Sequence, residues 1–284
     1  MRKLFYILMV ISFASCQDFF LQEVDVKIDK YPKGVAVTAI WVNAQEGGKI
    51  FISEANPILD STPQVITNAE IKVSSTKGSI WGISTIDSDG AFDCIPNNSV
   101  TIGDKLSLQI KVANFPELTA SQIVPDTVSL KTFEFILNGF SNPDGYKENL
   151  YKINLDDPIG KNYYGVKIVQ LDEQGNESRL YLSSSDQYYK GESDSQVHLF
   201  NDHLFNGKNI TLNLHGSNWN GNEGKIIIYL YNLSEDLYRY FYAEGIKGED
   251  EENPFQEPVV IPQNIANGYG IFGIASCTKK IVEL

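Results

Sequence analysis

The sequence has few cysteines, few histidines and an excess of acidic residues, and each shortage narrows the possible classes of protein. Three Cys and three His among 284 residues are too few for a disulfide-rich scaffold or an array of zinc modules. The 23 Lys and Arg against 36 Asp and Glu leave a formal net charge of −13. A nucleic-acid binder needs clustered basic side chains against phosphates. We therefore expect no nucleic-acid partner.

Long hydrophobic runs are also absent. The longest apolar stretch, Leu4 to Phe13, follows the basic pair Arg2 and Lys3. A run of about ten apolar residues is too short to cross ~30 Å of hydrocarbon, and this arrangement is typical of a secretory signal. We expect residues 1–15 to be a signal peptide and the remainder to be soluble.

The export signal ends in Phe13-Ala14-Ser15-Cys16, which resembles the lipobox of bacterial lipoproteins, although Phe13 replaces the usual branched aliphatic residue. The resemblance implies acylation of Cys16, and two acyl chains hold a protein on a membrane almost permanently. Residues 16–32 would then be a lipidated tether. The alternative is an ordinary signal peptide cleaved near Ala14, with Cys16 incidental.

The motifs of common catalytic sites are missing as well. The chain contains no Gly-x-Ser-x-Gly elbow and no Gly-rich phosphate loop that ends in Lys. We therefore predict that it is not an enzyme and needs no cofactor.

Two groups of side chains are weak metal candidates. The zinc candidates, whose spacing fits no helical pair of ligands, are His198, Asp202, His203 and His215. The calcium candidates surround a glycine but lack the terminal bidentate Glu; they are Asp87, Asp89 and Asp93. We expect neither group to bind a metal. Cys94 and Cys277 remain open as either a disulfide or two buried thiols.

Hydrophobic residues recur with a period of two along most of the chain, which predicts an all-β protein. A first antiparallel sandwich is expected over residues 33–132, with strands at 35–42, 49–53, 69–74, 80–83, 91–95 and 105–112. A second β domain is expected over residues 133–284, with strands at 163–169, 178–182, 208–214 and 225–231. Val259–Ile261, which lies between two prolines, is expected to be a short edge strand.

One segment near the C-terminus predicts a helix. Ser234 is a suitable N-cap, Glu235 and Asp236 complement the helix dipole, and Gly245 is suited to end the helix. Apolar residues recur every four positions, at Leu233, Leu237 and Phe241. Alternate tyrosines at 238, 240 and 242 leave a strand as the competing interpretation.

The final segment resembles the closing signature of an uncharacterised family of Bacteroidetes outer-membrane lipoproteins, catalogued as domain of unknown function 4249. The resemblance rests on the segments 253–255, 257–258, 262–265 and 267–273, on Phe200-Asn201-Asp202 and Phe205-Asn206-Gly207-Lys208, and on Tyr238-Arg239-Tyr240. It implies an immunoglobulin- or transthyretin-like β-sandwich, followed by a second β-sandwich-like domain with one short helix near the C-terminus. No catalytic residues follow from it.

The resemblance also implies a function, namely a non-enzymatic accessory that binds cargo for a TonB-dependent outer-membrane transporter. The alternatives are a structural envelope scaffold without a small ligand and, third, an envelope hydrolase. The outer membrane is the expected location, and the single acid just after Cys16 favours its periplasmic face over the cell surface.

Exposed aromatic side chains are suited to binding sugars and peptides, and they also fill sandwich cores. The candidate ligand or partner surface comprises Tyr188, Tyr189, Trp219, Phe255, Asn264, Asn267 and Tyr269. The pair Tyr188 and Tyr189, within a polar loop, is the one we most expect to be exposed. For the closing segment we favour a structural role, in which Gly268, Gly270 and Gly273 permit positive φ or close backbone approach. A ligand or partner loop is the alternative.

Overall fold

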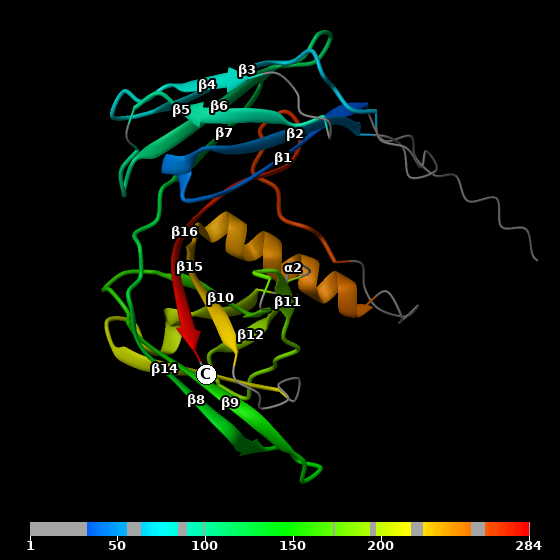
Figure 1. The fold of residues 1–284 in the computed structure, drawn as a ribbon. Helices are drawn as coiled ribbons and strands as arrows, with labels where there is room; N and C mark the ends of the chain where they lie inside the picture. Colours follow the sequence, from blue (N-terminus) through cyan, green and yellow to red (C-terminus); the bar gives the residue numbers. More distant parts are fainter. Residues whose placement is uncertain are drawn as a thin grey trace, which may run out of the picture. The chain divides into compact units, whose positions relative to one another are not determined.

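Alternating hydrophobic residues build two β-sandwiches that share one long strand (Figure 1). The computed structural model describes residues 33–283 except 56–63, 85–89, 99, 173, 194–196, 217–223 and 251–258. Several residues discussed above lie outside the described residues: Cys16, Asp87, Asp89, Trp219 and Phe255. The all-β fold with one short helix near the C-terminus is confirmed.

The first sandwich packs two sheets around a continuous apolar core. One sheet contains β1 (Gly34–Val42), β2 (Gly48–Ala55), β5 (Phe92–Pro96) and β4 (Trp81–Ser84), and the facing sheet contains β3 (Glu70–Ser75), β6 (Lys105–Lys111) and β7 (Leu118–Ile123). Along β6 the predicted alternation holds, because Leu106, Leu108 and Ile110 are buried while Lys105 and Lys111 are exposed. Asn43 and the 3-10 turn η1 (Ala44–Glu46) connect β1 to β2.

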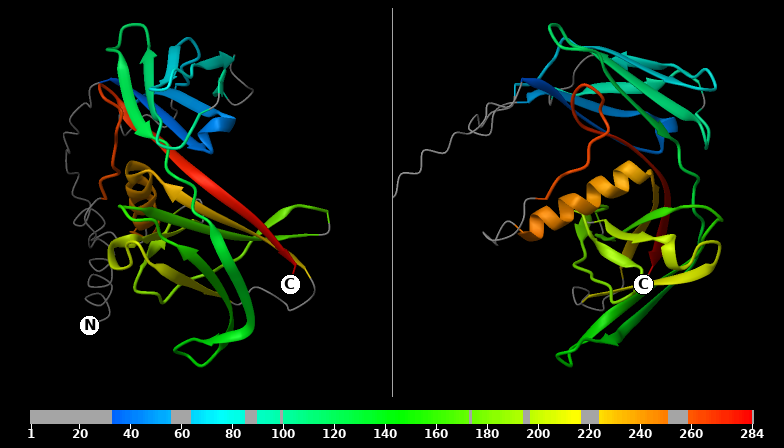
Figure 2. Two further views of the ribbon diagram at one scale, coloured as in Figure 1. Left: turned by 90° about the vertical axis from the view of Figure 1, so that its left-hand side faces the viewer. Right: turned by 180° about the vertical axis from the view of Figure 1, so that it is seen from behind.

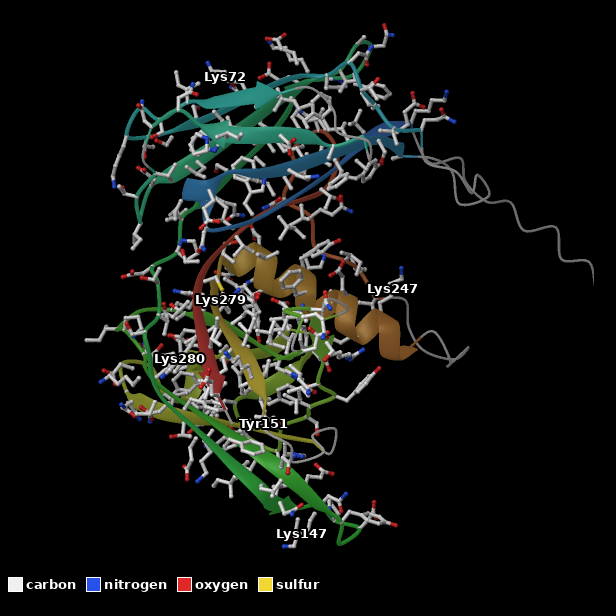
Figure 3. The ribbon with its side chains drawn as sticks, in the orientation of Figure 1. Lys72, Lys147, Tyr151, Lys247, Lys279 and Lys280 are labelled. Carbon is white, nitrogen blue, oxygen red and sulfur yellow. The ribbon has the colours of Figure 1, made fainter. Side chains whose placement is uncertain are left out.

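The second sandwich is built in the same way. Its larger sheet contains β12 (Tyr189–Glu192), β13 (His198–Asn201), β10 (Tyr163–Leu171), β15 (Lys225–Leu233) and β16 (Tyr269–Glu283), with β11 (Glu177–Arg179) paired to β10. Its smaller sheet contains β14 (Asn209–Gly216), β9 (Lys147–Asp156) and β8 (Leu130–Ser141), and the 3-10 turn η2 (Asp202–Leu204) precedes β14. Tyr151, labelled in Figure 3, is fully buried in the core between the sheets.

Strand β16 joins the two sandwiches into one ten-stranded sheet. Its first half runs parallel to β1, from the pair Tyr269 and Ala36 to the pair Ala275 and Val42. From Ala275 onward it runs antiparallel to β15. Figure 2 shows β16 in red, extending from β1 to the strands of the second sandwich. The domain boundary between residues 132 and 133 stays a prediction, and β16 belongs to both sandwiches.

The chain that passes from the first sandwich to the second is fastened to this shared strand. The Ser276 hydroxyl donates to the Pro125 carbonyl at 2.7 Å, and the Thr278 hydroxyl donates to the Val128 carbonyl at 2.7 Å. From β15, the buried Asn232 amide donates to the Asp126 carbonyl at 3.0 Å. Side chains therefore satisfy main-chain groups that a free linker would leave to water.

The closing signature at residues 264–273 has the structural role that its glycines suggest. Gly270 has a φ of +102°, and a Cβ there would lie 2.0 Å from the Val37 carbonyl oxygen. The Asn264 amide pairs with the main chain of Phe272, accepting from its N–H and donating to its carbonyl, both at 2.8 Å. Only glycine allows β16 to lie this close to β1.

Helix α2 (Glu235–Asp250) begins where the sequence predicts but continues beyond the predicted end. The Ser234 carbonyl accepts from the Tyr238 N–H at 2.9 Å, and the Ser234 hydroxyl accepts from the Ile274 N–H at 3.3 Å. The expected stop at Gly245 is wrong. A Cβ at Gly245 would lie 2.0 Å from the Glu192 carbonyl oxygen, so this glycine lets the helix pack against β12.

Three further expectations need correction or completion. The strand expected at 178–182 is shorter, because after Arg179 the main chain forms only an isolated bridge, from Ser183 to His215. Val259–Ile261 forms no strand, and Val260 is 84% exposed. The two described cysteines are free thiols, and burial raises the pKa of Cys94 to about 12.

Candidate functional site

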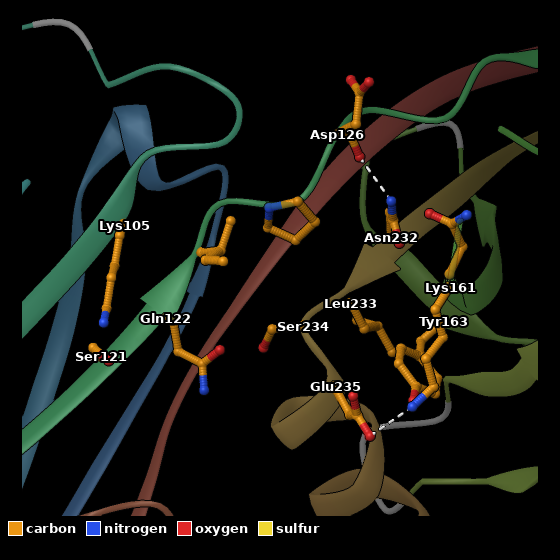
Figure 4. A pocket seen from close by; sticks show the side chains of 13 residues that line it. Lys105, Ser121, Gln122, Asp126, Lys161, Tyr163, Asn232, Leu233, Ser234 and Glu235 are labelled. Carbon is orange, nitrogen blue, oxygen red and sulfur yellow. Dashed lines mark hydrogen bonds and ion pairs between the residues drawn. The ribbon is translucent and has the colours of Figure 1, made fainter. Parts of the chain in front are cut away.

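A polar groove of about 490 Å³ lies where the two sandwiches and the start of α2 meet (Figure 4). The first sandwich contributes Lys105, Ser121, Gln122 and Ile123; the connecting chain contributes Pro125 and Asp126; the second sandwich and α2 contribute Lys161, Asn162, Tyr163, Asn232, Leu233, Ser234 and Glu235. The fastening of the connecting chain to β15 and β16 fixes the spacing of these walls. The groove is therefore preorganised, which lowers the entropic cost of binding.

One wall of the groove is an ion pair at the beginning of α2. The Lys161 Nζ lies 2.9 Å from the Glu235 Oε1. The pKa of Lys161 is raised by its hydrogen bonds with Tyr163 and Glu235, and the pKa of Glu235 is lowered mainly by its hydrogen bond with Lys161. Both groups are therefore charged at neutral pH, so the wall carries a donor and an acceptor side by side.

The opposite wall continues into a second hollow of about 530 Å³ that shares Lys105 and Ser121 with the first. The carboxylate of Asp236 stands at the boundary between the two hollows. It accepts from the Gln122 amide at 2.6 Å and from the Asn264 amide at 3.0 Å. Because Gln122 belongs to β7 and Asp236 to α2, this contact connects the two sandwiches directly.

The chemistry of the groove suits recognition of a polar ligand. Its described lining combines amides, hydroxyls, ammonium groups and carboxylates with the apolar surfaces of Ile123, Pro125, Tyr163 and Leu233. It contains no His or Cys, so these lining residues offer no imidazole base and no thiol nucleophile. Alternating donors and acceptors beside an aromatic ring fit hydroxyl-rich molecules or extended peptides.

The structure places the sequence-predicted surface residues mainly in packing roles. Tyr188 and Tyr189 are half-buried, which corrects the expectation that this pair is exposed: Tyr188 packs edge-on against Phe205, and Tyr189 packs against Phe200. The ring of Tyr269 packs over Gly34. As binding residues they stay predictions, and these three lie outside the groove lining.

The two described asparagines of the candidate surface have different surroundings. Asn264 lines the second hollow while bonding to β16. Asn267 has a φ of +62° and donates to the Glu117 carbonyl at 3.0 Å. The groove itself was missed from the sequence because its residues come from four distant segments with no shared motif. The helix cap at Ser234 is the single local signal that points to it.

The zinc candidates do not converge. No group of three or more potential ligand side chains capable of holding a metal occurs in the described part of the chain. His198 is buried in the second sandwich, and Asp202 accepts from the Asn162 N–H at 2.8 Å. His203 is exposed on η2.

His215 forms a polar cluster that resembles a catalytic triad only in composition. Its Nδ1 lies 2.7 Å from the Glu148 Oε2 and 3.5 Å from the Ser183 Oγ. In a triad the carboxylate and the nucleophile occupy different ring nitrogens. Here both meet Nδ1, so the arrangement is not that of a triad, and the Phe140 ring stacks on the imidazole with 3.8 Å between the ring centroids.

Acidification is expected to destabilise the fold through His198. Burial and the nearby Arg179 charge lower the pKa of His198 from 6.5 to about 4. Between pH 6.5 and 4 the unfolded chain takes up a proton at this position and the folded chain does not. The free energy of unfolding therefore falls as the pH falls. At 1.36 kcal/mol per pKa unit, the loss reaches ~3 kcal/mol. Urea unfolding at pH 7 and pH 4.5 measures this difference.

His198→Gln should remove this dependence of the unfolding free energy on pH between pH 6.5 and 4, whatever the stability of the variant at pH 7. Glu148→Gln is the control. The pKa of Glu148 is lowered by its hydrogen bond with His215, so its contribution is lost only as the pH falls below about 4.5. If the unfolding free energy of His198→Gln depends on pH as that of the unchanged protein does, His198 is not the group responsible.

The fold and the groove define the class: an all-β protein of two fused sandwiches with a preorganised polar groove at their junction. No helix among the described residues has the length and apolar character needed to cross a bilayer. The chain belongs to the family described as domain of unknown function (DUF4249), whose match covers residues 22–281. A search of curated proteins finds no match.

Proposed function

We propose that this protein is a non-enzymatic, lipid-anchored cell-envelope protein that holds a polar cargo in the groove and delivers it to a TonB-dependent outer-membrane transporter. Acylation at Cys16 would fix it to the outer membrane, with the periplasmic face as the favoured location. The observation that carries the binding part is the preorganised groove, whose polar side chains converge from both sandwiches. The anchor and the transporter rest on the sequence alone.

The cargo class that best fits the groove is a hydroxyl-rich molecule, such as an oligosaccharide. The Lys161–Glu235 pair, the Asn162 amide and the Ser121 hydroxyl provide hydrogen-bond donors and acceptors. Adjacent hydroxyl groups of a sugar both donate and accept hydrogen bonds, which such a set satisfies. A strongly anionic cargo is disfavoured because Asp126, Glu235 and Asp236 line the two hollows.

Removing the ammonium groups of the groove is expected to weaken cargo binding. Glycan and peptide arrays probed with residues 17–284, which retain the compact unit Lys33–Leu284, would identify a ligand. Hydrogen bonds to charged groups contribute ~1.5–3 kcal/mol. Lys105→Ala combined with Lys161→Ala should therefore weaken the best array ligand by roughly tenfold or more, measured by titration calorimetry.

The matched control is Lys111→Ala, a lysine on the same strand as Lys105 that does not line the groove. Its affinity should equal that of the unchanged protein. If the folded double variant binds the ligand as tightly as the unchanged protein does, the groove is not the binding site.

Delivery to a transporter is tested separately. The full-length chain, purified with mild detergent from cells that naturally make it, should be recovered with a TonB-dependent receptor in stoichiometric amount. Recovery of the chain alone under these conditions counts against the transporter and favours an envelope scaffold.

A further inference from the structure

Two neighbouring loops of the second sandwich expose aliphatic side chains. The Ile159 loop (residues 157–162) joins β9 to β10, and the Leu204 turn (residues 202–208) joins β13 to β14. Ile159 is 93% exposed and Leu204 is 51% exposed. The loops adjoin, because a Cβ on Gly207 would lie 3.1 Å from the Ile159 Cγ1. Two aliphatic side chains are thus exposed on adjoining loops.

Main-chain hydrogen bonds fasten these loops to each other. The Asp157 N–H donates to the Lys208 carbonyl at 3.0 Å, and the Asp202 N–H donates to the Asn162 carbonyl at 3.3 Å. Beside Ile159 itself, the Gly160 N–H donates to the Asn206 Oδ1 at 3.0 Å. The exposed tip is therefore held rigidly.

Two buried carboxylates support the same loops from below. Asp157 accepts from the Tyr164 hydroxyl and, at 2.6 Å, from the Gly207 N–H. Asp202 accepts from the Asn162 N–H at 2.8 Å. Both carboxylates are 5% exposed. Burying carboxylates is costly, even when they are fully hydrogen-bonded.

These hydrogen bonds explain two sequence segments of the family resemblance that do not line the groove. Phe200-Asn201-Asp202 and Phe205-Asn206-Gly207-Lys208 supply the buried Asp202, the Asn206 acceptor and the Gly207 donor, while Phe205 is buried beneath them at 1% exposure. Gly207 has a φ of +72°, which favours glycine at this turn. The two segments thus build a rigid support for the tip.

The exposed charged side chains of the two loops have one sign. Lys161 and Lys208 are exposed, whereas Asp157 and Asp202 are buried. Lys161 is also paired with Glu235. In a chain whose formal net charge is −13, an aliphatic tip flanked by cations is a local exception. It complements an apolar pocket whose rim carries carboxylates.

We propose that Ile159 is a docking anchor that inserts into an apolar pocket with an acidic rim on a partner protein. Anchors of this kind are most effective when rigid, because binding then orders no loop. The inference is independent of the groove and of its cargo. Burying one isoleucine contributes only part of the affinity of a protein–protein contact, so the exposed Lys161 and Lys208 supply orientation as well as affinity.

Two other occupants fit the observations less well. A symmetric contact with a second copy places the same patch on both partners, so Lys161 and Lys208 would face their own counterparts. A lipid surface would gain little from two aliphatic side chains. The test separates these from a partner protein.

Photo-crosslinking in intact cells that naturally make the protein tests the proposal. A photoreactive phenylalanine derivative replaces Ile159 in the full-length chain, and the same derivative replaces Val260, which is 84% exposed, as the control. We expect a discrete adduct with another protein from position 159 and none of that mass from position 260. The crosslinked partner peptide should contain Asp or Glu.

Reversing the charge of Lys208 then tests whether the lysines beside Ile159 take part in docking. Lys208→Glu should lower the adduct yield about fivefold or more, because like charges across an interface cost several kcal/mol. Replacing the partner's crosslinked carboxylate with Lys should restore the yield in Lys208→Glu. No adduct at position 159, an adduct only with a second copy or with lipid, equal adducts at both positions, or indifference to Lys208→Glu would each overturn the proposal.

Discussion

In a chain that ends at Gly268, neither sandwich is expected to fold. It lacks β16, which lies between β1 and β15 in the ten-stranded sheet. Ile271, Phe272 and Ile274 are each at most 1% exposed, and burying such side chains stabilises by ~1.5–3 kcal/mol each. Their loss alone approaches the whole stability of a typical domain, ~5–15 kcal/mol. Far-UV circular dichroism and urea unfolding should show no cooperative transition.

The control ends at Lys280 and lacks only the last residues of β16, where Ile281 is 55% exposed. It keeps all pairing with β1 and should unfold cooperatively. Trp41 and Trp81 are both buried in the first sandwich, so with the third tryptophan, Trp219, replaced by Phe in both chains, tryptophan fluorescence reports on that sandwich. A native tryptophan spectrum with a cooperative transition in the chain that ends at Gly268 would show that the first sandwich folds without β16.

Gly270→Ala is expected to destabilise the protein strongly, because backbone strain and a steric clash both act at this position. Its φ of +102° disfavours alanine, and the added Cβ would lie 2.0 Å from the Val37 carbonyl oxygen. Backbone strain contributes ~1–3 kcal/mol, and relief of the clash requires β16 to move away from β1. We expect a loss of ~4 kcal/mol or more, at the upper end of single-substitution effects.

Gly78→Ala isolates the backbone contribution. Gly78 has a φ of +90°, but a Cβ added there would meet no atom within 4 Å beyond its chain neighbours, so its replacement adds strain without a clash. We expect it to cost ~1–2 kcal/mol in urea unfolding. Equal losses in the two variants would mean that the close approach of β16 and β1 contributes nothing.

Local patterns account for most of the elements. Leu106, Leu108 and Ile110 alternate with polar residues because β6 has one buried face. The start of α2 was also predicted from local residues, Ser234 and the two acids after it, although in the structure the Ser234 hydroxyl accepts from the Ile274 N–H of β16. The helix end is not local. Gly245 is a helix-ending residue in isolation, yet its missing side chain allows contact with Glu192.

Long-range pairing explains the remaining errors. Nothing near Tyr269 indicates that it pairs with Ala36 at the other end of the described chain. Strands paired over such separations depend on the whole core, and local sequence carries little information about them. Tyr188 looked exposed because its neighbours are polar, but Phe205, brought from another turn, covers its ring.

The candidate site was the least predictable part for the same reason. Gln122, Lys161 and Asp236 have no common motif and meet only because β16 fuses the sandwiches. The glycines of the closing segment were predicted correctly as structural. They fix the geometry of the groove without lining it.

Hydrogen exchange with bound cargo tests the central claim most directly. With the tightest array ligand at saturation, amides of segments 121–126, 161–163 and 232–236 should slow together, because these segments line one groove. Strand β3, whose residues do not line the groove, should be unchanged. Protection confined to the segment around Tyr188 and Tyr189, or no protection at saturation, would contradict the groove as the ligand site.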